Sequence, residues 1–500
     1  MSQVELLSHQ ILHFKRVLEI LKDHKAYLDT SQMGAGKTYL TIKVAQVLKL
    51  KMLVVAPVST ISMWKKTAEE YGVELVDVLS YAGLRGTKNG VKHPWLDRTQ
   101  DEFWASKDFT KLVNEGVLVV FDEMHNLKNK ATAQIYSAHS LAIEVAASKG
   151  VSRIALLSAT PCDKAVHTES IFKMLGIITH DELYVYEREG NEFGAGEYVL
   201  TGFKEASKFC KKWNPDVTKE ILSPNNVEIA ITRRNADKLT YELYTQVAKK
   251  IISSDMTRPQ ILAKKDVKNG FYNLSAKKLI EMKKAVAGLS RAVGYDGDRI
   301  DGSKGNLGAV TTNLLKIENI KVDIYSRLIK DTLDTNPQAK VVVFMSYKEP
   351  MSNLASELRA YKPMIMNGQT IAKNRDVIVS KFQEYNTKNR LLIAQIKVGG
   401  IGISLDDRHG EYPRYAFITP TYFFIDLYQA GGRIYRTSTK STATIRMIYG
   451  KESNNPQPKA LEARILDAMA RKTDVAKNML ANPNSERMPF PGEFTSEIEA

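Results

Sequence analysis

The octapeptide Ser-Gln-Met-Gly-Ala-Gly-Lys-Thr at residues 31–38 decides how this chain folds around a ligand, because it joins an apolar run to a run of helix formers. Gly34 and Gly36 can take backbone angles that turn successive N–H groups toward phosphate oxygens. A helix that starts here points its positive end at the same anion. We therefore expect Lys37 to reach the outer phosphates of a nucleotide and the Thr38 hydroxyl to bind Mg²⁺.

The octapeptide alone leaves a second interpretation open. It starts with Ser31 where the usual pattern has glycine, and a Gly-Lys-Thr turn can simply connect a strand to a helix. The apolar run Val117–Phe121, however, is followed directly by Asp122 and Glu123. A carboxylate at the end of a strand is well placed to hold Mg²⁺ beside a phosphate loop, and the next one can polarise water. Alone this pair would be a solvated loop, but with the octapeptide it favours a nucleotide site.

Composition narrows the class of protein. The 500 residues are enough for two to four domains, and 43% are hydrophobic while 25% are charged. The formal net charge of +15 favours a polyanionic partner such as nucleic acid, although lysine-rich solvated faces are an alternative. We expect no membrane span and no secretion signal, and hence an intracellular protein of the cytoplasm, the nucleus or a viral factory. Two cysteines are too few for a disulfide framework.

Short apolar runs alternate with helical stretches, which is typical of α/β proteins with parallel sheets. The runs form one set before about residue 180 and a second set after about residue 335. The expected strands are Lys51–Val58, Val117–Asp122, Arg153–Ser158, Glu228–Thr232, Lys340–Met345, Arg390–Gln395, Tyr415–Thr419 and Thr444–Tyr449.

The segment between the two sets is different in composition. It is rich in lysine and helix formers, and Ser275 could cap a helix with one apolar stripe. Repeated glycines after Gly294 are typical of a linker. We expect residues 185–319 to be a helical insertion with this linker, and residues 488–500 to be a disordered tail.

Further segments carry polar and glycine patterns in a fixed order. They are Val55–Lys66, Asp122–Asn129, Leu157–Pro161, Lys340–Ser346, Asn367-Gly368, Lys397–Leu405 and Gln429–Arg436. With the octapeptide they resemble, in order, the motifs of superfamily 2 helicases and translocases. The chain is most similar to Swi/Snf-related ATPases and their viral relatives, such as poxvirus nucleoside triphosphate phosphohydrolase I and viral DEAD/DExH-box helicases.

This resemblance implies two tandem RecA-like P-loop domains. The first would be the ATP-binding domain at 1–184, followed by the insertion at 185–319. The C-terminal helicase domain would be 320–455, with a brace helix at 456–487 and the tail at 488–500.

The resemblance also implies roles for individual residues. Lys37, Asp122 and Glu123 would be catalytic, joined by Arg433 and Arg436, which are three apart and would face the γ-phosphate from one side of a helix. Thr38 and Asp122 would hold the metal. The expected nucleotide contacts are Gln10, near the adenine, together with Gly34, Ala35, Gly36, Lys37, Thr38 and Gln429. The expected nucleic-acid contacts are Ser59, Thr60, Gly399, Gly400 and Ser404. Ser158 and Thr160 would couple the two sites.

For Trp64 and for the lysines at 204–212, two interpretations stay open. Trp64 could stack on nucleic acid, although a buried packing role is favoured. The lysines could extend a nucleic-acid track or form a solvated helix face.

The implied activity is ATP-dependent translocation on DNA, favoured to be duplex, without sequence specificity and with ATP and Mg²⁺ as cofactors. We expect a monomer that has a transcription or replication protein as partner. A strand-separating RNA or DNA helicase remains open, as does a P-loop NTPase that needs no nucleic acid.

Overall fold

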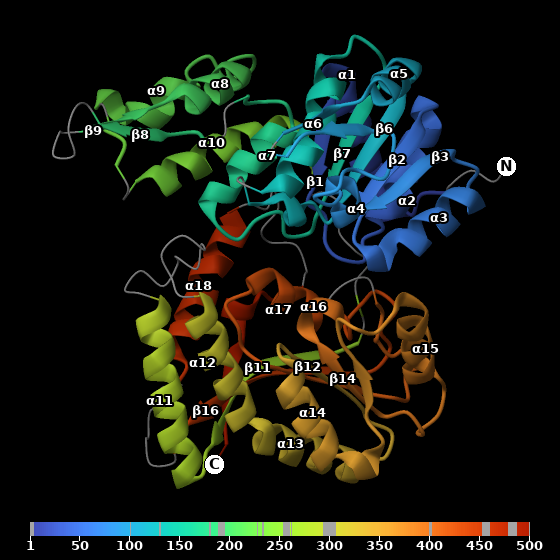
Figure 1. The fold of residues 1–500 in the computed structure, drawn as a ribbon, viewed down its shortest axis with the longest axis vertical. Coiled ribbons are helices and arrows are strands. Elements are labelled where there is room, and N and C mark those ends of the chain that lie inside the picture. The colour runs from blue at the N-terminus through green and yellow to red at the C-terminus, as the bar shows by residue number, and fades with distance from the viewer. Residues whose placement is uncertain are drawn as a thin grey trace. The chain divides into compact units, whose positions relative to one another are not determined.

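The computed structural model describes residues 5–100, 102–129, 132–179, 182–188, 196–227, 229–232, 235–253, 261, 263–293, 307–399, 403–452, 461–478 and 488–499. The chain divides into two compact units, one made of residues 1–259 with 475–486 and the other of residues 260–474 with 487–500. Figure 1 shows strands and helices in both units. In the described residues no helix is both long enough and apolar enough to cross a bilayer.

The first unit is built on a six-stranded parallel sheet with the order β10-β1-β7-β6-β2-β3. Its strands are β1 (Ala26–Asp29), β2 (Lys51–Ala56), β3 (Leu75–Ser80), β6 (Val117–Asp122), β7 (Arg153–Leu157) and β10 (Ile252–Ser253). The central strands are largely apolar because both sheet faces are covered, and every residue of β6 is buried.

The helices of the first unit cover this sheet and extend beyond it (Figure 1). They are α1 (Ser8–Asp23), α2 (Lys37–Leu48), α3 (Ile61–Glu70), α4 (Tyr81–Arg85), α5 (Lys107–Glu115), α6 (Ala133–Ala147), α7 (Thr168–Met174), α8 (Thr201–Cys210), α9 (Val217–Leu222) and α10 (Ala236–Ile251). Two antiparallel pairs join them, β4 (Leu96–Arg98) with β5 (Phe103–Ala105) and β8 (Val185–Arg188) with β9 (Gly196–Val199). Cys162 and Cys210 are buried and free, as expected of a chain without a disulfide framework.

The second unit holds a seven-stranded parallel sheet with the order β13-β14-β12-β15-β16-β11-β17. Its strands are β11 (Lys265–Asn273), β12 (Lys340–Met345), β13 (Met364–Met366), β14 (Leu391–Gln395), β15 (Arg414–Ile418), β16 (Ala443–Lys451) and β17 (Thr495–Ile498). Its helices are α11 (Ala276–Val293), α12 (Leu307–Ile320), α13 (Val322–Thr335), α14 (Lys348–Glu357), α15 (Ala372–Gln383), α16 (Ile396–Gly399) and α17 (Phe424–Gly431). Helix α18 (Ala463–Asn478) begins in this unit, and its residues from Val475 on belong to the first unit.

The predicted fold class is confirmed, since each unit is a parallel sheet of the RecA-like α/β kind. The expected internal limits differ from those of the structure. Helices α8 to α10 belong to the first unit, whereas β11 lies inside the expected insertion and pairs with β16 of the second unit. The expected strand Glu228–Thr232 is wrong over its described residues, 229–232, which have no strand.

The expected disorder of the tail is also wrong. Residues 488–499 are described, and they contain β17, which pairs in parallel with β11. The amide of Asn273 donates to the Glu499 carboxylate at 2.7 Å, and Asn269 donates to the Phe494 carbonyl. The tail is therefore part of the second sheet.

Candidate nucleotide site

The phosphate loop joins β1 to α2 at the carboxyl edge of the first sheet, where ligands of parallel sheets bind. Gly34 has φ 79° and Gly36 has φ 94°, both in the left-handed region that favours glycine. Helix α2 begins at Lys37, immediately after these turns. The expected strand–loop–helix arrangement, with Ala35 between the two glycines, is therefore present.

Lys37 bends back over its own loop. Its Nζ donates to the carbonyl oxygens of Ser31 at 2.7 Å and Gln32 at 3.0 Å. These neutral acceptors hold the ammonium beside the loop, and a phosphate would be a stronger, charge-assisted partner. Thr38 is half-buried in the first turn of α2, one residue beyond Lys37.

Gln10 of α1 contacts the phosphate loop, and its expected place near the adenine stays a prediction. Its side chain is 3% exposed, its Nε2 donates to the Ala35 carbonyl at 3.1 Å, and its Oε1 accepts from the Leu7 amide. A Cβ at Gly36 would collide with the Gln10 amide nitrogen. Gln10 therefore braces the phosphate loop from α1, and the loop needs glycine at position 36 for this contact as well as for its backbone angle.

Asp122 ends β6 at the same sheet edge and is held by three donors. Its Oδ2 accepts from Trp64 Nε1 at 2.9 Å and from Thr60 Oγ1 at 3.3 Å. Its backbone carbonyl accepts from the Tyr81 hydroxyl at 2.7 Å. Trp64 is fully buried, so the packing interpretation is the one that the structure shows, and its indole N–H has the further task of fixing the carboxylate.

The surroundings of Asp122 disfavour its ionised form. Burial and the neighbouring Glu123 raise its pKa to about 6, while the bonds from Trp64 and Thr60 and the charge of Lys37 lower it. A nearby cation would lower the pKa of Asp122, because it favours the ionised carboxylate.

The residues present fit Mg²⁺. A carboxylate and a hydroxyl are the oxygen ligands that this ion takes, usually completed by water and by substrate phosphates. With Oδ2 of Asp122 engaged by Trp64, its Oδ1 and the Thr38 hydroxyl are the atoms that would hold the cation.

Glu123 and His125 connect the expected catalytic and coupling residues. Glu123 has φ 54° and ψ 54°, a left-handed conformation directly after the strand. His125 Nδ1 lies 3.2 Å from Glu123 Oε2 and 3.2 Å from Ser158 Oγ. Ser158 Oγ in turn accepts from the Thr160 amide at 3.3 Å. A polar chain thus runs from Glu123 to the segment after β7, and sequence reasoning did not single out His125 as its link.

Ser59 and Thr60 were expected to contact nucleic acid. Ser59 is half-buried in the turn after β2, which leaves the prediction untested. Thr60 is 8% exposed, and its hydroxyl donates to the Pro57 carbonyl and to Asp122. The polar atom of Thr60 therefore faces the interior of the first unit, and its contact with nucleic acid stays a prediction.

Arg433 and Arg436 converge on one atom. The Nη1 of Arg433 and the Nη2 of Arg436 both donate to the Ile403 carbonyl, at 3.3 Å and 2.6 Å. The expectation that both arginines share one side of a helix is wrong, since α17 ends at Gly431 and both lie in the turns that follow it. The Leu405 amide donates to the Arg433 carbonyl at 2.9 Å, so this segment and the 403–405 loop are fastened together.

The remaining predicted residues of the second unit are near this junction in the sequence. Gln429 lies on α17 and is 2% exposed. The Ser404 hydroxyl donates to Asp406 Oδ1 at 2.6 Å, which is a partner other than the expected nucleic-acid phosphate. Gly399 ends α16, and Gly400 lies outside the described residues.

A buried acid-base pair behind the phosphate loop was missed. His13 Nε2 of α1 lies 3.1 Å from Asp29 Oδ2 of β1, and both side chains are fully buried. A carboxylate at the end of the apolar strand before a phosphate loop was a signal for it, but the partner is 16 residues earlier and no local pattern connects the two.

The fold and this site define a P-loop ATPase with two RecA-like units. No protein-family model matches the chain. A protein of Acanthamoeba polyphaga mimivirus, provisionally named an ATP-dependent RNA helicase, is 25% identical over 460 residues, which cover 89% of this chain and 79% of that protein. This relative confirms the predicted resemblance to superfamily 2 helicases, viral members included, and the predicted enzyme class of helicase ATPases.

Other likenesses are more distant. Drosophila melanogaster transcription termination factor 2 is 23% identical over 192 residues, which cover 35% of this chain and 17% of that protein. The Sulfolobus solfataricus SWI2/SNF2 ATPase core in complex with dsDNA is 18% identical, covering 89% of this chain and 88% of that chain with a TM-score of 0.32. The Pyrococcus furiosus Hef helicase domain is 14% identical, covering 89% and 95%, with a TM-score of 0.37.

Proposed function

We propose that the chain hydrolyses ATP to ADP and phosphate while it tracks along DNA, preferably duplex, without reading sequence. The observation that carries the ATPase part is the meeting of two features at one sheet edge. The phosphate loop leaves β1 there, and Asp122 with Glu123 leaves β6 there, two strands away. Parallel strands bring all such carboxyl ends to the same edge.

The proposed chemistry follows from the residues at that edge. Mg²⁺, when bound, would neutralise charge on the phosphates. The loop amides and Lys37 hold the triphosphate, while Glu123 accepts the proton of the water that attacks the γ-phosphorus as the bond to the β-phosphate oxygen breaks. His125, 3.2 Å from Glu123, orients that carboxylate.

Arg433 and Arg436 belong to the proposed site by resemblance. Guanidinium groups would stabilise the charge that spreads over the transferred phosphoryl group. Their shared acceptor, the Ile403 carbonyl, is neutral, so an exchange of this partner for a phosphate oxygen gains a charge-assisted bond.

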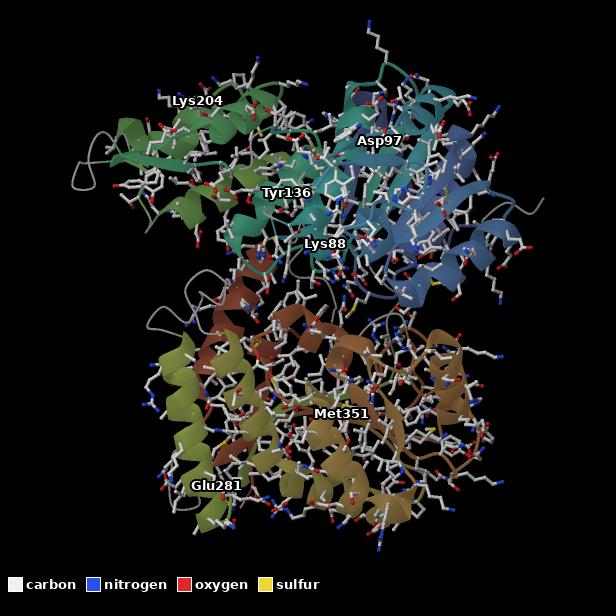
Figure 2. The ribbon with its side chains drawn as sticks, in the orientation of Figure 1. Lys88, Asp97, Tyr136, Lys204, Glu281 and Met351 are labelled. Atoms are coloured by element: carbon white, nitrogen blue, oxygen red, sulfur yellow. The ribbon has the colours of Figure 1, made fainter. Side chains whose placement is uncertain are left out.

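The nucleic-acid part is supported by charge. The formal net charge is +15, and α8 with the residue pair after it carries four exposed lysines: Lys204, Lys208, Lys211 and Lys212. Figure 2 shows Lys204 on α8 in the first unit. Lysine–phosphate contacts position a protein on a backbone without reading bases, as sequence-independent tracking requires. We propose an intracellular site of action, where such a polymer is present.

A strand-separating RNA helicase is the second candidate, because the mimivirus relative carries that name. Two assays on the purified chain separate the candidates. A DNA translocase displaces the third strand of a DNA triplex when ATP is present and leaves a tailed RNA duplex intact. Unwinding of the RNA duplex without triplex displacement would replace DNA tracking by the second candidate.

A further inference from the structure

The buried pair His13–Asp29 has no role in the chemistry above, yet it touches the phosphate loop. Asp29 is the last residue of β1, and its Oδ1 accepts from the Ser31 amide, the first amide of the loop, at 2.8 Å. Its Oδ2 lies 3.1 Å from His13 Nε2, with both side chains 0% exposed. Asp29 thus holds the start of the loop with one oxygen and faces α1 with the other.

A carboxylate at this place is an electrostatic problem. Burial pushes the pKa of Asp29 up, but the charge and hydrogen bond of His13, the charge of Lys37 and the bond from Ser31 together bring it below its ordinary value, so the group is an anion. An unbalanced anion behind the loop would repel a triphosphate, and in a poorly solvated interior this repulsion is strong.

The same anion competes for the cation of the loop. The charge of Lys37 contributes to the low pKa of Asp29, so the two groups attract each other. Even so, the Lys37 Nζ donates to the Ser31 and Gln32 carbonyls. A second cation close to Asp29 would explain how Lys37 keeps this position. His13 lies 3.1 Å from Asp29 and comes from α1, three residues after Gln10, which braces Ala35.

We propose that His13 is a positioning residue which, as an imidazolium, neutralises Asp29, so that Asp29 can anchor the loop through Ser31 without repelling ATP or capturing Lys37. The inference rests on the proposed ATP site and adds a function for α1. It predicts that loss of His13 weakens ATP binding only while the charge of Asp29 remains.

The test is a double-mutant cycle on the full chain, with affinity for MgATP measured by displacement of a fluorescent ATP analogue. His13→Gln leaves the anion unbalanced and is expected to weaken ATP binding about tenfold, which is about 1.4 kcal/mol. Asp29→Asn keeps the shape and the acceptor for Ser31 but removes the charge, so its affinity should stay within about threefold of the wild type. The combined variant should return to the Asp29→Asn value.

Matched controls are His24→Gln and Asp23→Asn, at the end of the same helix, which should bind ATP like the wild type. In turnover, His13→Gln should raise KM with kcat kept within about threefold, the sign of lost binding without lost chemistry. Wild-type affinity in His13→Gln, or a combined variant as weak as His13→Gln, would overturn the proposal.

If His13→Gln does not fold, which circular dichroism would show, Asp29→Asn and the combined variant carry the test. Affinity lowered more than about threefold in either one contradicts charge neutralisation. Lys37→Ala separates this inference from the proposed function. Undiminished ATP binding in Lys37→Ala removes the ATP site itself, whereas failure of the cycle alone removes only the role of His13.

Discussion

Glu123 occupies backbone angles that non-glycine residues rarely adopt, with φ 54° directly after the buried strand β6. Such a conformation costs on the order of 1–3 kcal/mol and persists where the surrounding structure enforces it, often at functional sites. Here it turns the carboxylate to within 3.2 Å of His125. The strain is therefore explained if the position of this carboxylate matters for activity.

Substitutions of Glu123 and Lys37 should have different effects on ATP binding and turnover. Glu123→Gln should bind ATP within about threefold of the wild type but lose at least about 100-fold in turnover, as general bases do. Lys37→Ala should lose both binding and turnover, because it removes a phosphate contact. Steady-state hydrolysis and ATP titration measure these outcomes. Normal turnover in Glu123→Gln would show that another group activates the water.

The arginine pair gives a second prediction at this scale. Arg433→Ala and Arg436→Ala should each reduce kcat by about 10³-fold, the lower range for an arginine finger, while ATP affinity falls less than in Lys37→Ala. Arg408→Ala, an exposed arginine beside Asp406, is the matched control and should be neutral. Full turnover in both variants would exclude these arginines from the transition state.

Residue roles were predictable from sequence only where a motif carries them. The loop glycines, Lys37, Asp122 and Glu123 are local signals, and the structure places all of them at one sheet edge. The second partners of these groups come from distant segments, such as Trp64 on Asp122, 58 residues apart. No pattern within a single segment encodes such a pair, so the contacts that Thr60 and Gln10 make inside the first unit were not predicted.

At the scale of elements, α12 contributes a buried carboxylate that joins it to β12. Glu318 is 2% exposed and accepts from the amides of Ser346 at 2.7 Å and Tyr347 at 3.0 Å. Burial raises its pKa from 4.5 to about 7, with the two amides, Lys321 and Thr419 acting in the opposite direction. This makes the helix–strand junction sensitive to pH.

The direction in which stability changes with pH follows from proton binding. Between pH 4.5 and 7 the folded chain holds a proton on Glu318 that the unfolded chain has lost, so this contribution to stability is present below pH 4.5 and is lost as pH rises through 7. Glu318→Gln should match the wild type in thermal unfolding at pH 5 and exceed it at pH 8, by up to about 3 kcal/mol. The exposed Glu357→Gln is the control. A difference that does not grow with pH would contradict a neutral Glu318.

The tail strand gives another prediction for an element. Arg446 Nε of β16 lies 2.5 Å from Glu497 Oε2, which ties β17 to the second sheet. Arg327 Nη2 of helix α13 lies 2.8 Å from Oε1 of Glu499, the residue after β17. Deletion of residues 495–500 should lower the unfolding temperature by roughly 5 °C, the effect of about 2 kcal/mol in a unit of this size. Thr495→Ser is the control. An unchanged midpoint after deletion would mean that the tail does not stabilise the sheet.

Strands β11 and β17 escaped prediction for a physical reason. Both lie at one side of the second sheet. Only Asn269, Gly270 and Phe271 of β11 are buried, and no residue of β17 is. Polar side chains such as Asp266 therefore replace the apolar run, and they pair with Arg446, 180 residues later. Central strands such as β2, β6 and β12 were predictable because burial on both faces favours the long apolar runs that their sequences show.

The whole molecule combines a nucleotide site in one unit with a formal net charge of +15 over the chain. A fixed excess of positive charge raises the local concentration of a polyanion and makes its binding dependent on salt. An ATPase that merely happens to be basic would bind nucleic acid without a change in turnover. The proposed function requires the two to be coupled.

The most direct measurement is the steady-state rate of ATP hydrolysis by the purified chain without nucleic acid and with duplex DNA, single-stranded DNA and RNA in turn. We predict a stimulation of at least about tenfold, largest with duplex DNA, that disappears in Lys37→Ala and weakens as salt is raised. A rate that is the same in all four conditions, or activity retained in Lys37→Ala, would rule out the proposed function.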